Sequence, residues 1–421
     1  SLHKQTLERV KRELSQFCIC DENEEIEFKN NKLQKPSIIV LKKNYLILKK
    51  WKNSLASFGY CHGNPLFVID DEGDASSLNT MVNKEKISTI NKNLDSIKRL
   101  SNSSIYLQVT GTPQALLLQT SISNWRPSFI FYFTPGKSYL GGNFFFSNND
   151  ISSAICLTDD LEAEELKKDD ELVDNGLISA LVYFLFSSAH KMLIDNELVS
   201  NFLIHPSYKI ADHELFAEKI GCYLNSILND LNENEISESI REIYNKISIQ
   251  KEDFICFEDA IDFIIDSISK HKIQITIMNS KSVVGEYNQG VNIIIGGNSL
   301  GRGITFPKLN TVYYSRTSKI PQADTIWQHS RIFGYDRDRD LVKIFLSPKL
   351  FKSFCEVNSI NNSIVSQIKK LSSEKITIIT PQKIRATRPQ VIDNKCIKLI
   401  VGGVNYFPFY PKNEKPFELD S

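Results

Sequence analysis

The sequence has no excess of charge of either sign. Its 421 residues include 50 Lys and Arg and 50 Asp and Glu, so the formal net charge is zero. This balance argues against a histone-like or polybasic partner of nucleic acid, although it is compatible with a local basic groove. The 41% of hydrophobic and 24% of charged residues are ordinary for a globular protein, and the length suggests two or three domains.

The runs that mark membrane and secreted proteins are also missing. The longest apolar stretch, residues 177–189, has 13 residues and ends at His190 and Lys191, whereas a bilayer span takes about 20. The first residues lack the apolar core of a signal peptide and an initiator Met, which suggests a fragment or a processed chain. We therefore expect a cytoplasmic protein with no membrane partner.

Paired cysteine motifs are absent as well. The chain has 8 scattered cysteines, and the only close pair is Cys18 and Cys20. Because no CxxC motif pairs with a second CxxC or with HxxxH, the sequence does not indicate a zinc site. Reduced thiols in a cytosolic protein are the simpler interpretation.

Short apolar strands alternate with longer helical stretches, which is typical of a mainly parallel sheet covered by helices. We expect strands at residues 37–41, 66–69, 105–110, 129–133, 291–295, 311–315 and 342–346. A long block over about 159–272 shows helical spacing of its apolar residues, notably at 177–189, 213–231 and 257–268. The sequence therefore predicts two α/β lobes with a helical insertion between them.

The expected boundaries follow from this pattern. The first lobe covers residues 1–150, the helical insertion 151–275 and the second lobe 276–371. Residues 372–421 mix β-branched runs with several prolines, so they are expected to form an appended extension of low regularity.

An acidic turn follows the strand expected at 66–69. The apolar run leads directly into Asp70, Asp71, Glu72 and Asp74. In α/β proteins, ligands bind at the carboxyl edge of the sheet. A carboxylate there can hold Mg²⁺ through water, and a neighbouring Glu can orient or deprotonate an attacking water. The alternative is a solvated turn that caps the next helix.

The next expected strand ends in Thr110, Gly111 and Thr112. Small hydroxyl residues at a strand end can hydrogen-bond a neighbouring acid and relay its state to another lobe. This signal is weak when taken alone.

Two further motifs lie in the C-terminal half. A loop after strand 291–295 carries Gly297, Gly301, Arg302, Gly303 and Thr305. Its glycines allow close backbone approach, and its Arg and Thr supply donors for phosphate. Later, Gln328 and Arg331 stand at i and i+3, so on a helix they would face the same way. For each arginine a surface ion pair is the alternative.

In this order, the motifs resemble motifs II, III, V and VI of superfamily 2 helicases and translocases. The closer likeness is to the helicase-like Z-one domain, an endonuclease family by name that is found in bacterial restriction and phage-defence operons. Its Asp-Asp-Glu-x-Asp turn followed by Ala-Ser resembles residues 70–76. Its Gly-Gly-x-x-Leu-x-Arg-Gly-x-Thr loop resembles 296–305, and its Gln-x-x-Arg-x-Phe-Gly-Tyr element resembles 328–335. The likeness covers nearly the whole chain.

The resemblance implies two RecA-like lobes of the P-loop NTPase type that use ATP and Mg²⁺. It implies that Asp71 coordinates Mg²⁺ through water, that Glu72 activates the attacking water, and that Thr110 and Thr112 couple the acids to lobe closure. Arg331 would be the arginine finger with Gln328 beside it. The remaining implied contacts to nucleotide or nucleic acid are Gly297, Gly301, Arg302, Gly303, Thr305, Arg337 as the alternate finger, and Arg385 with Arg388 as a second DNA patch.

One expected motif is absent. A Walker A loop, Gly-x-x-x-x-Gly-Lys-Ser/Thr, should precede the acidic turn, because its amides and Lys grip phosphates. The sequence contains none. Residues 2–9 resemble the segment that follows the Walker A helix in this family, so we expect the loop upstream of Ser1. The chain alone should then hydrolyse ATP poorly or not at all.

The leading hypothesis is an ATP-dependent DNA translocase or helicase-like subunit of a restriction or phage-defence system, working with a partner nuclease or other defence subunits. One alternative is an endonuclease subunit with its own site, for which Asp21, Glu27 and Lys29 have a PD-(D/E)xK-like spacing. Another is an inactive helicase-shaped scaffold that binds DNA or partner proteins. We interpret His205 as a buried, hydrogen-bonded structural residue rather than a general base.

Overall fold

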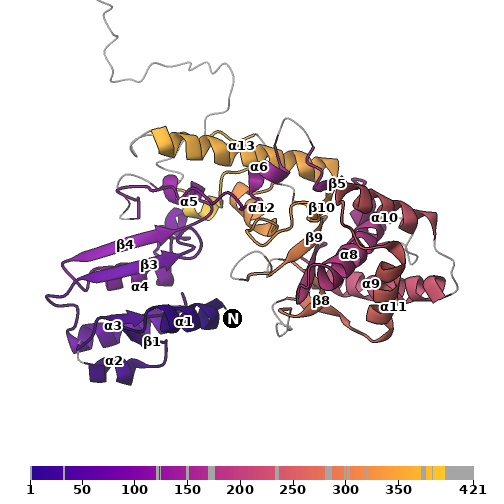
Figure 1. Ribbon diagram of the computed structural model, residues 1–421. Coiled ribbons are helices and arrows are strands. Elements are labelled where there is room, and N and C mark those ends of the chain that lie inside the picture. Colours follow the sequence, from indigo (N-terminus) through magenta and orange to yellow (C-terminus); the bar gives the residue numbers. More distant parts are fainter. Residues whose placement is uncertain are drawn as a thin grey trace, which may run out of the picture.

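The chain folds as an α/β protein in which parallel strands are covered by helices (Figure 1). The computed structural model describes residues 2–31, 34–119, 123, 125–147, 151–168, 176–232, 237–279, 287–297, 300, 304–318, 320–370, 376–381 and 383–393. The α/β class expected from the sequence is confirmed.

The largest sheet has six strands, all paired in parallel, in the spatial order β5-β10-β9-β6-β8-β7. The strands are β5 Ile155–Leu157, β6 Val199–His205, β7 Ile273–Met278, β8 Gly290–Gly296, β9 Leu309–Tyr314 and β10 Lys343–Leu346. The central strands β6, β8 and β9 are buried almost from end to end. Strands buried on both faces pack apolar side chains on both faces, as residues 202–204 of β6 and 293–295 of β8 do.

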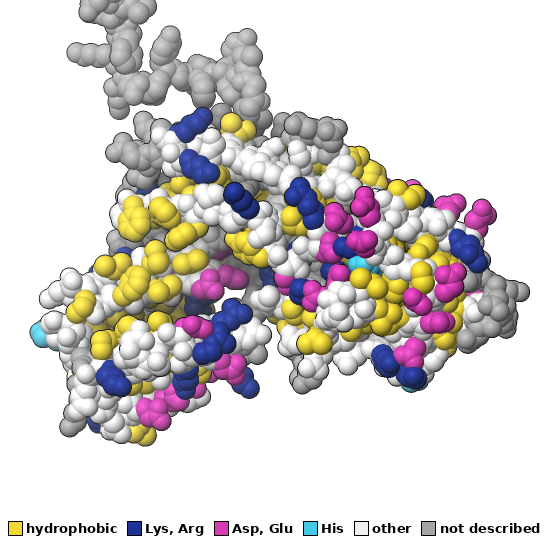
Figure 2. Space-filling model, in the orientation of Figure 1, with side chains coloured by type: hydrophobic (Ala, Val, Ile, Leu, Met, Phe, Trp, Pro, Cys, Tyr) yellow, Lys and Arg dark blue, Asp and Glu magenta, His cyan; other side chains and the backbone are white. Residues whose placement is uncertain are grey.

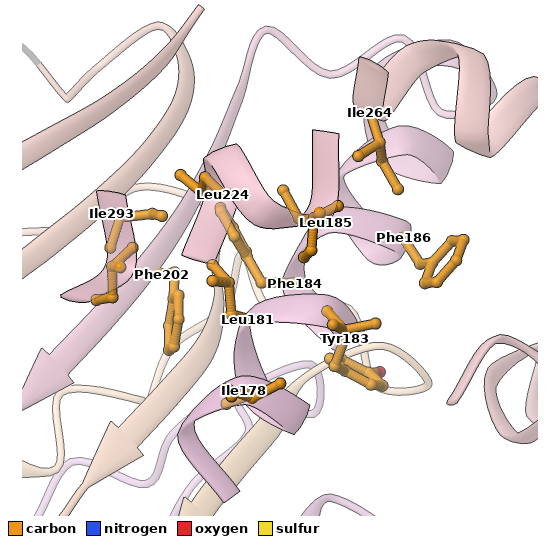
Figure 3. Packing of buried hydrophobic residues seen from close by; sticks show 14 of the residues in the cluster. Ile178, Leu181, Tyr183, Phe184, Leu185, Phe186, Phe202, Leu224, Ile264 and Ile293 are labelled. Carbon is orange, nitrogen blue, oxygen red and sulfur yellow. The ribbon is translucent and has the colours of Figure 1, made fainter. Parts of the chain in front are cut away.

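Four helices lie on one side of this sheet. They are α8 Gly176–Leu193, α9 Ile210–Asn232, α10 Glu238–Gln250 and α11 Phe257–Ser269. Helices α8 and α9 contact its strands, and α10 and α11 pack against these helices. Phe202 and Ile293 point from the sheet into a cluster that contains Phe184 and Leu224 of the helices (Figure 3). Helix α8 is apolar on all sides because it contacts the sheet as well as α10 and α11. By length and composition it could cross a membrane, but 78% of that window is buried inside the molecule.

The opposite face is covered by α6 Gly142–Phe145, α12 Ala323–His329 and α13 Pro348–Lys370. Alternate residues of the strands point to this side, so Leu203 and Ile294 join this cluster while their neighbours face α8. The rings of Phe146 and Phe354 stack with centroids 4.7 Å apart. The sheet is therefore the middle of three layers.

The N-terminal part contains two separate sheets of two parallel strands each. Strands β1 Cys18–Cys20 and β2 Ser37–Ile39 pair with each other, as do β3 Leu66–Asp71 and β4 Ser104–Val109. The helices here are α1 Leu2–Glu13, α2 Glu25–Asn31, α3 Tyr45–Phe58, α4 Thr89–Lys98 and α5 Gln114–Leu117. The short element η1 Val82–Lys84 also lies here, and α7 Glu162–Glu165 and η3 Pro389–Val391 lie later in the chain.

Helix α3 shows local signals at both ends. The Asn44 side chain accepts a hydrogen bond from the Leu46 amide, and Gly59 ends the helix in the left-handed conformation at φ 65°. Trp51 and Leu48 of this helix are buried in the two N-terminal clusters. The helix thus connects the packing of the β1–β2 and β3–β4 sheets.

No described residue covers one face of the β3–β4 sheet. Phe67 and Ile69 of β3 are 59% and 62% exposed, and Ile105 of β4 is 63% exposed. Hydrophobic side chains gather over these strands on the surface (Figure 2). The opposite face carries Val68 and Tyr106 and packs against the α4 side of the core.

Several expected elements differ from the structure. Residues 129–133 have the composition of a strand but form none, because no described strand pairs with them. The side chains of Phe129, Phe131 and Phe133 are 64%, 71% and 82% exposed. The block expected to be helical throughout contains β6, which lies in the middle of the six-stranded sheet. Helices α8, α9 and α11 are confirmed. The domain boundaries at 150, 275 and 371 stay predictions.

Candidate functional site

The acidic turn lies at the C-terminal end of β3, as expected. The buried carboxylate of Asp70 accepts hydrogen bonds from Lys43 Nζ at 3.0 Å and from the Tyr106 hydroxyl at 2.8 Å. Asp70 is therefore occupied by hydrogen bonds within the protein and has a structural role. Asp71 is exposed, and Glu72 adopts a left-handed backbone with φ 50°. Of the acids in the turn, Asp71 is thus the exposed one, and Glu72 is half-buried.

Burial strongly raises the pKa of Tyr106, and the negative charge of Asp70 adds to the effect. The tyrosine therefore stays protonated and keeps donating its hydrogen bond. Together with Lys43, it holds the strand end that precedes the turn.

Lys43 was not assigned a role by the sequence. Its ammonium donates to the backbone carbonyls of Asp71 at 2.5 Å and Glu72 at 2.9 Å. The only sequence signal for this contact was that Lys43 follows strand β2, while the acids follow strand β3.

The threonines expected to couple the two lobes surround a second buried acid. Asp74 is completely buried and accepts hydrogen bonds from Thr110 Oγ1 at 2.7 Å and Thr112 Oγ1 at 3.1 Å. Gln328 Nε2 donates to Thr112 Oγ1 at 2.6 Å. The structure therefore brings Gln328 of α12 to the acidic turn through a single threonine hydroxyl.

Arg331 does not lie on the expected helix. Helix α12 ends at His329, and Arg331 has a left-handed backbone with φ 52°. Burial lowers the pKa of Arg331, while the negative charge of Glu72 acts in the opposite direction, so the two side chains lie within electrostatic reach. Left-handed backbone in residues other than glycine costs free energy and concentrates at functional sites.

Arg337, the alternate finger, hydrogen-bonds to backbone carbonyls at and next to Arg331. Its side chain is 5% exposed. It donates from Nε to the Ile332 carbonyl at 2.8 Å and from Nη2 to the Arg331 carbonyl at 3.2 Å, and it pairs with Asp336. Its observed contacts support the position of Arg331.

A histidine pair lies behind this site. His205, at the end of β6, is completely buried and stacks on His329 with centroids 5.7 Å apart. His329 Nδ1 contacts Arg316 Nη1 at 2.6 Å. Neither ring nitrogen of His205 has a hydrogen-bond partner among the described residues. The interpretation of His205 as buried is confirmed, but its expected hydrogen bond is absent there.

The environment of His205 opposes its protonation. Burial lowers its pKa well below the usual value, and the positive charges of His329 and Arg316 lower it further. His205 is therefore neutral in the folded protein at neutral pH.

The glycine-rich loop is described only in part. Gly301, Arg302 and Gly303 lie outside the described residues. Gly297 is required for space, because a Cβ there would lie 2.7 Å from the Ser207 carbonyl oxygen. Thr305 is exposed.

The two arginines of the expected second DNA patch have different surroundings. The Arg385 side chain is exposed, while its amide and carbonyl bond to Pro321 and Ala323 beside α12. Arg388 Nη2 instead donates to the backbone carbonyls of Asp74 at 2.5 Å and Ala75 at 2.7 Å. Only Arg385 is presented to solvent as a DNA contact requires.

A cavity of about 710 Å³ lies between α12 and the N-terminal part. Gln328, His329 and Arg388 line it from one side, and Ser76 and Thr89 are among the hydroxyl residues on the other. A second cavity of about 810 Å³ lies beside β5. The first cavity is next to the candidate site because Ala75, Gln328 and Arg388 line it, but Asp71, Glu72 and Arg331 are not among its lining residues.

The fit of a magnesium ion rests on Asp71. Among the described residues there is no group of three or more His, Cys, Asp or Glu side chains that could hold a metal. Mg²⁺ usually retains several waters and needs only one or two carboxylates together with substrate phosphates. The exposed Asp71 carboxylate fits that requirement.

The Z1 domain family is the family called the Z-one domain above. It matches residues 176–391. This range is slightly more than half of the 421 residues. The chain belongs to the Z1 domain family. The match includes Gln328, Arg331 and Arg388, whereas Asp71 and Glu72 lie outside it.

No curated protein matches the chain. Among solved structures, the chain is similar to an ATP-dependent Type ISP restriction-modification enzyme, LlaBIII, bound to DNA. The identity is 10%, the TM-score is 0.33, and the match covers 87% of this chain and 26% of the enzyme. The chain therefore spans about a quarter of that enzyme's length, and at this TM-score the likeness carries no conclusion about the Z1 protein.

Proposed function

We propose that this Z1 protein supplies the hydrolytic and coupling residues of an ATP-dependent DNA translocase or helicase-like subunit in a restriction or phage-defence system. One observation carries the proposal. Glu72 and Arg331 come from opposite sides of the contact between the N-terminal part and the six-stranded sheet, both have left-handed backbone, and they lie within electrostatic reach of each other. The family membership of residues 176–391 supports the same function.

In this proposal each side chain has a distinct task. The exposed carboxylate of Asp71 would hold Mg²⁺ through water, and bound ATP would supply the phosphoanhydride that is cleaved. Glu72 would orient the attacking water and accept its proton, and the Arg331 guanidinium would neutralise the negative charge that develops. Gln328 and Thr112 would pass the state of this site to α12, because they are hydrogen-bonded to each other.

The same proposal treats the two parts of the molecule as RecA-like lobes. Residues 1–150 would form the first, and the six-stranded sheet would be the body of the second. Since β5 and β6 belong to that sheet, the second lobe would begin before residue 276, with α8–α11 as part of it. DNA would contact the exposed Arg385 and the loop around Arg302, and partner nuclease or defence subunits would act with it in the cytoplasm.

A scaffold that binds DNA or partners without turnover is the second candidate, because Asp70 and Asp74 of the acidic turn are buried and hydrogen-bonded within the protein. A nuclease site receives no support from the structure. Asp21 caps a turn through the Asn23 amide, and Lys29 lies over the Phe58 ring.

The test measures ATP hydrolysis by wild type and variants of a chain that is extended at its N-terminus by a segment with a phosphate-binding loop. Glu72→Gln should keep ATP binding and nearly abolish hydrolysis, and Arg331→Ala should lower turnover on the order of 10³-fold. Glu85→Gln is the matched control, because Glu85 is exposed and has the same left-handed backbone at φ 55°. Wild-type hydrolysis by Glu72→Gln would reject the proposal, and absence of hydrolysis in every form would favour the scaffold.

A further inference from the structure

The backbone of the acidic turn is held by two cations from distant parts of the chain. Lys43 bonds to the carbonyls of Asp71 and Glu72 from within the N-terminal part. Arg388 bonds to the next pair of carbonyls, at residues 74 and 75, from the C-terminal end of the described chain. Four carbonyls around the left-handed Glu72 are thus fixed by charged donors.

Arg388 belongs to a segment that we call the strap, residues 384–391. The first half of the strap is anchored on the six-stranded sheet side. Ile384 is buried in the cluster of α12 and α13, and the Arg385 backbone bonds to Pro321 and Ala323. Thr387 Oγ1 donates at 2.7 Å to Asp324 of α12, and both residues are almost fully buried.

The second half of the strap is anchored on the N-terminal part. Val391 is buried in the cluster of α4 and the β3–β4 sheet. Asn83 Nδ2 donates to the Pro389 carbonyl at 3.3 Å, and Gln119 Nε2 donates to the Val391 carbonyl at 3.2 Å. The strap therefore connects the two parts of the molecule, with Arg388 at its middle.

We propose that Arg388 is a positioning residue: it ties the acidic turn, and with it Glu72, to the position of α12. This inference rests on the proposed function, because it assigns the regulation of the same site. Movement of α12 reaches the turn by two routes, through the strap to residues 74 and 75 and through Gln328 and Thr112 to the Asp74 carboxylate. An arginine suits this role because its guanidinium keeps its charge and presents several donors in one plane.

The geometry also separates this role from DNA binding. The Arg388 guanidinium contacts main-chain carbonyls inside the contact between the two parts, whereas the Arg385 side chain is exposed three residues earlier. The two arginines therefore form a matched pair for experiment. Arg385→Ala removes a surface charge of the same kind from the same strap without touching the turn.

Hydrogen exchange of the 421-residue protein tests the inference without requiring hydrolysis. The amides of Gly73 and Ala75 are bonded to the Val109 and Glu72 carbonyls, so both can report on the turn. Arg388→Ala should speed their exchange about tenfold or more, because hydrogen bonds from charged donors are lost, and Arg385→Ala should leave it unchanged. Thr387→Val should reproduce the effect from the other end of the strap.

Turnover provides the second readout, in the version that carries a phosphate-binding loop. Arg388→Ala should lower kcat about tenfold or more with little change in KM for ATP, and Arg388→Lys should recover part of kcat. Faster exchange in a protein that never hydrolyses ATP would retain the positioning role and reject the proposed function. Unchanged exchange in Arg388→Ala, together with a loss of DNA affinity equal to that of Arg385→Ala, would overturn the inference.

Discussion

Glu72 and Arg331 both have a left-handed backbone, which costs free energy in residues other than glycine. Both have φ near 50°, a region that favours glycine. The contacts of Arg337 and Lys43 with the neighbouring carbonyls hold these conformations in place. The backbone of the site is therefore held by two basic residues that bond to its carbonyls.

Glu72→Gly should separate stability from activity. Glycine adopts φ 50° without steric strain, so the free energy of unfolding should rise by about 1 kcal/mol while ATP hydrolysis is lost. Glu85→Gly, at φ 55° and away from the site, should give a similar gain with hydrolysis unchanged. Urea unfolding of both variants, with an activity assay, is the measurement. A destabilised Glu72→Gly would show that contacts of its side chain outweigh the strain.

His205 should make the folded state sensitive to acid. Its folded pKa is lowered, so below about pH 6.5 the unfolded chain binds a proton that the folded chain rejects. The contribution of His205 to the free energy of unfolding is therefore fully present above the pKa of the unfolded chain. As the pH drops below that pKa, the free energy of unfolding falls by up to about 1.4 kcal/mol per pH unit. Urea unfolding at pH 7.5, 6.0 and 5.0 should show a shallower acid limb for His205→Phe than for wild type.

The exposed His62 provides the control for this pH series. His62→Gln should keep the acid limb of the wild-type protein. Identical limbs for wild type and His205→Phe would mean that His205 does not dominate the acid response.

At the scale of elements, the largest surprise is β6. Its sequence mixes Ser, Asn and His with apolar residues, so it does not show the continuous apolar run of a buried strand. It also lies between helices α8 and α9, whose helical spacing led to the prediction that the whole block is helical. In the folded protein, Asn201 Nδ2 donates to the Tyr287 carbonyl, 86 residues away, at 3.2 Å, and the Ser200 hydroxyl contacts that of Ser188 at 2.8 Å. Sequence pattern alone carries no information about such partners.

Other elements were predictable because their local signals agree with their surroundings. Strands β3, β4, β8, β9 and β10 are short runs of β-branched and aromatic residues, and each has a parallel neighbour. Residues 129–133 have the same composition but no strand partner among the described residues. In the site, the acids and threonines were recognisable from motif order. Lys43 and the strap were not, because their roles depend on contacts across 28 to more than 300 residues.

Phe202→Ala should measure how much β6 contributes to the core. The Phe202 ring is completely buried and lies 5.3 Å from that of Phe184, so truncation should lower the free energy of unfolding by about 3–5 kcal/mol. Leu198→Ala, at a position 76% exposed just before the strand, should change it by less than about 0.5 kcal/mol. Denaturant unfolding followed by circular dichroism would decide. Equal effects would place the strand outside the cooperative core.

For the whole molecule, the zero net charge limits how DNA can bind. Affinity must come from local Lys and Arg contacts with phosphates, so it should be modest and should fall steeply with salt. Fluorescence anisotropy on several duplexes and single strands at two salt concentrations is the measurement. Arg302→Ala, in the loop outside the described residues, and Arg385→Ala should each weaken binding similarly on unrelated sequences. Sequence-selective binding with a shallow salt slope would indicate a base-reading protein instead.

The uncovered face of the β3–β4 sheet has a consequence for the behaviour of the protein in a test tube. Phe67, Ile69 and Ile105 present a flat apolar surface on a sheet of only two strands, and such surfaces promote sticking between copies. The purified chain should therefore self-associate more in concentrated stocks than in dilute ones. Polar replacement of Phe67 and Ile105 offers a direct route to a sample that stays monodisperse long enough to crystallise.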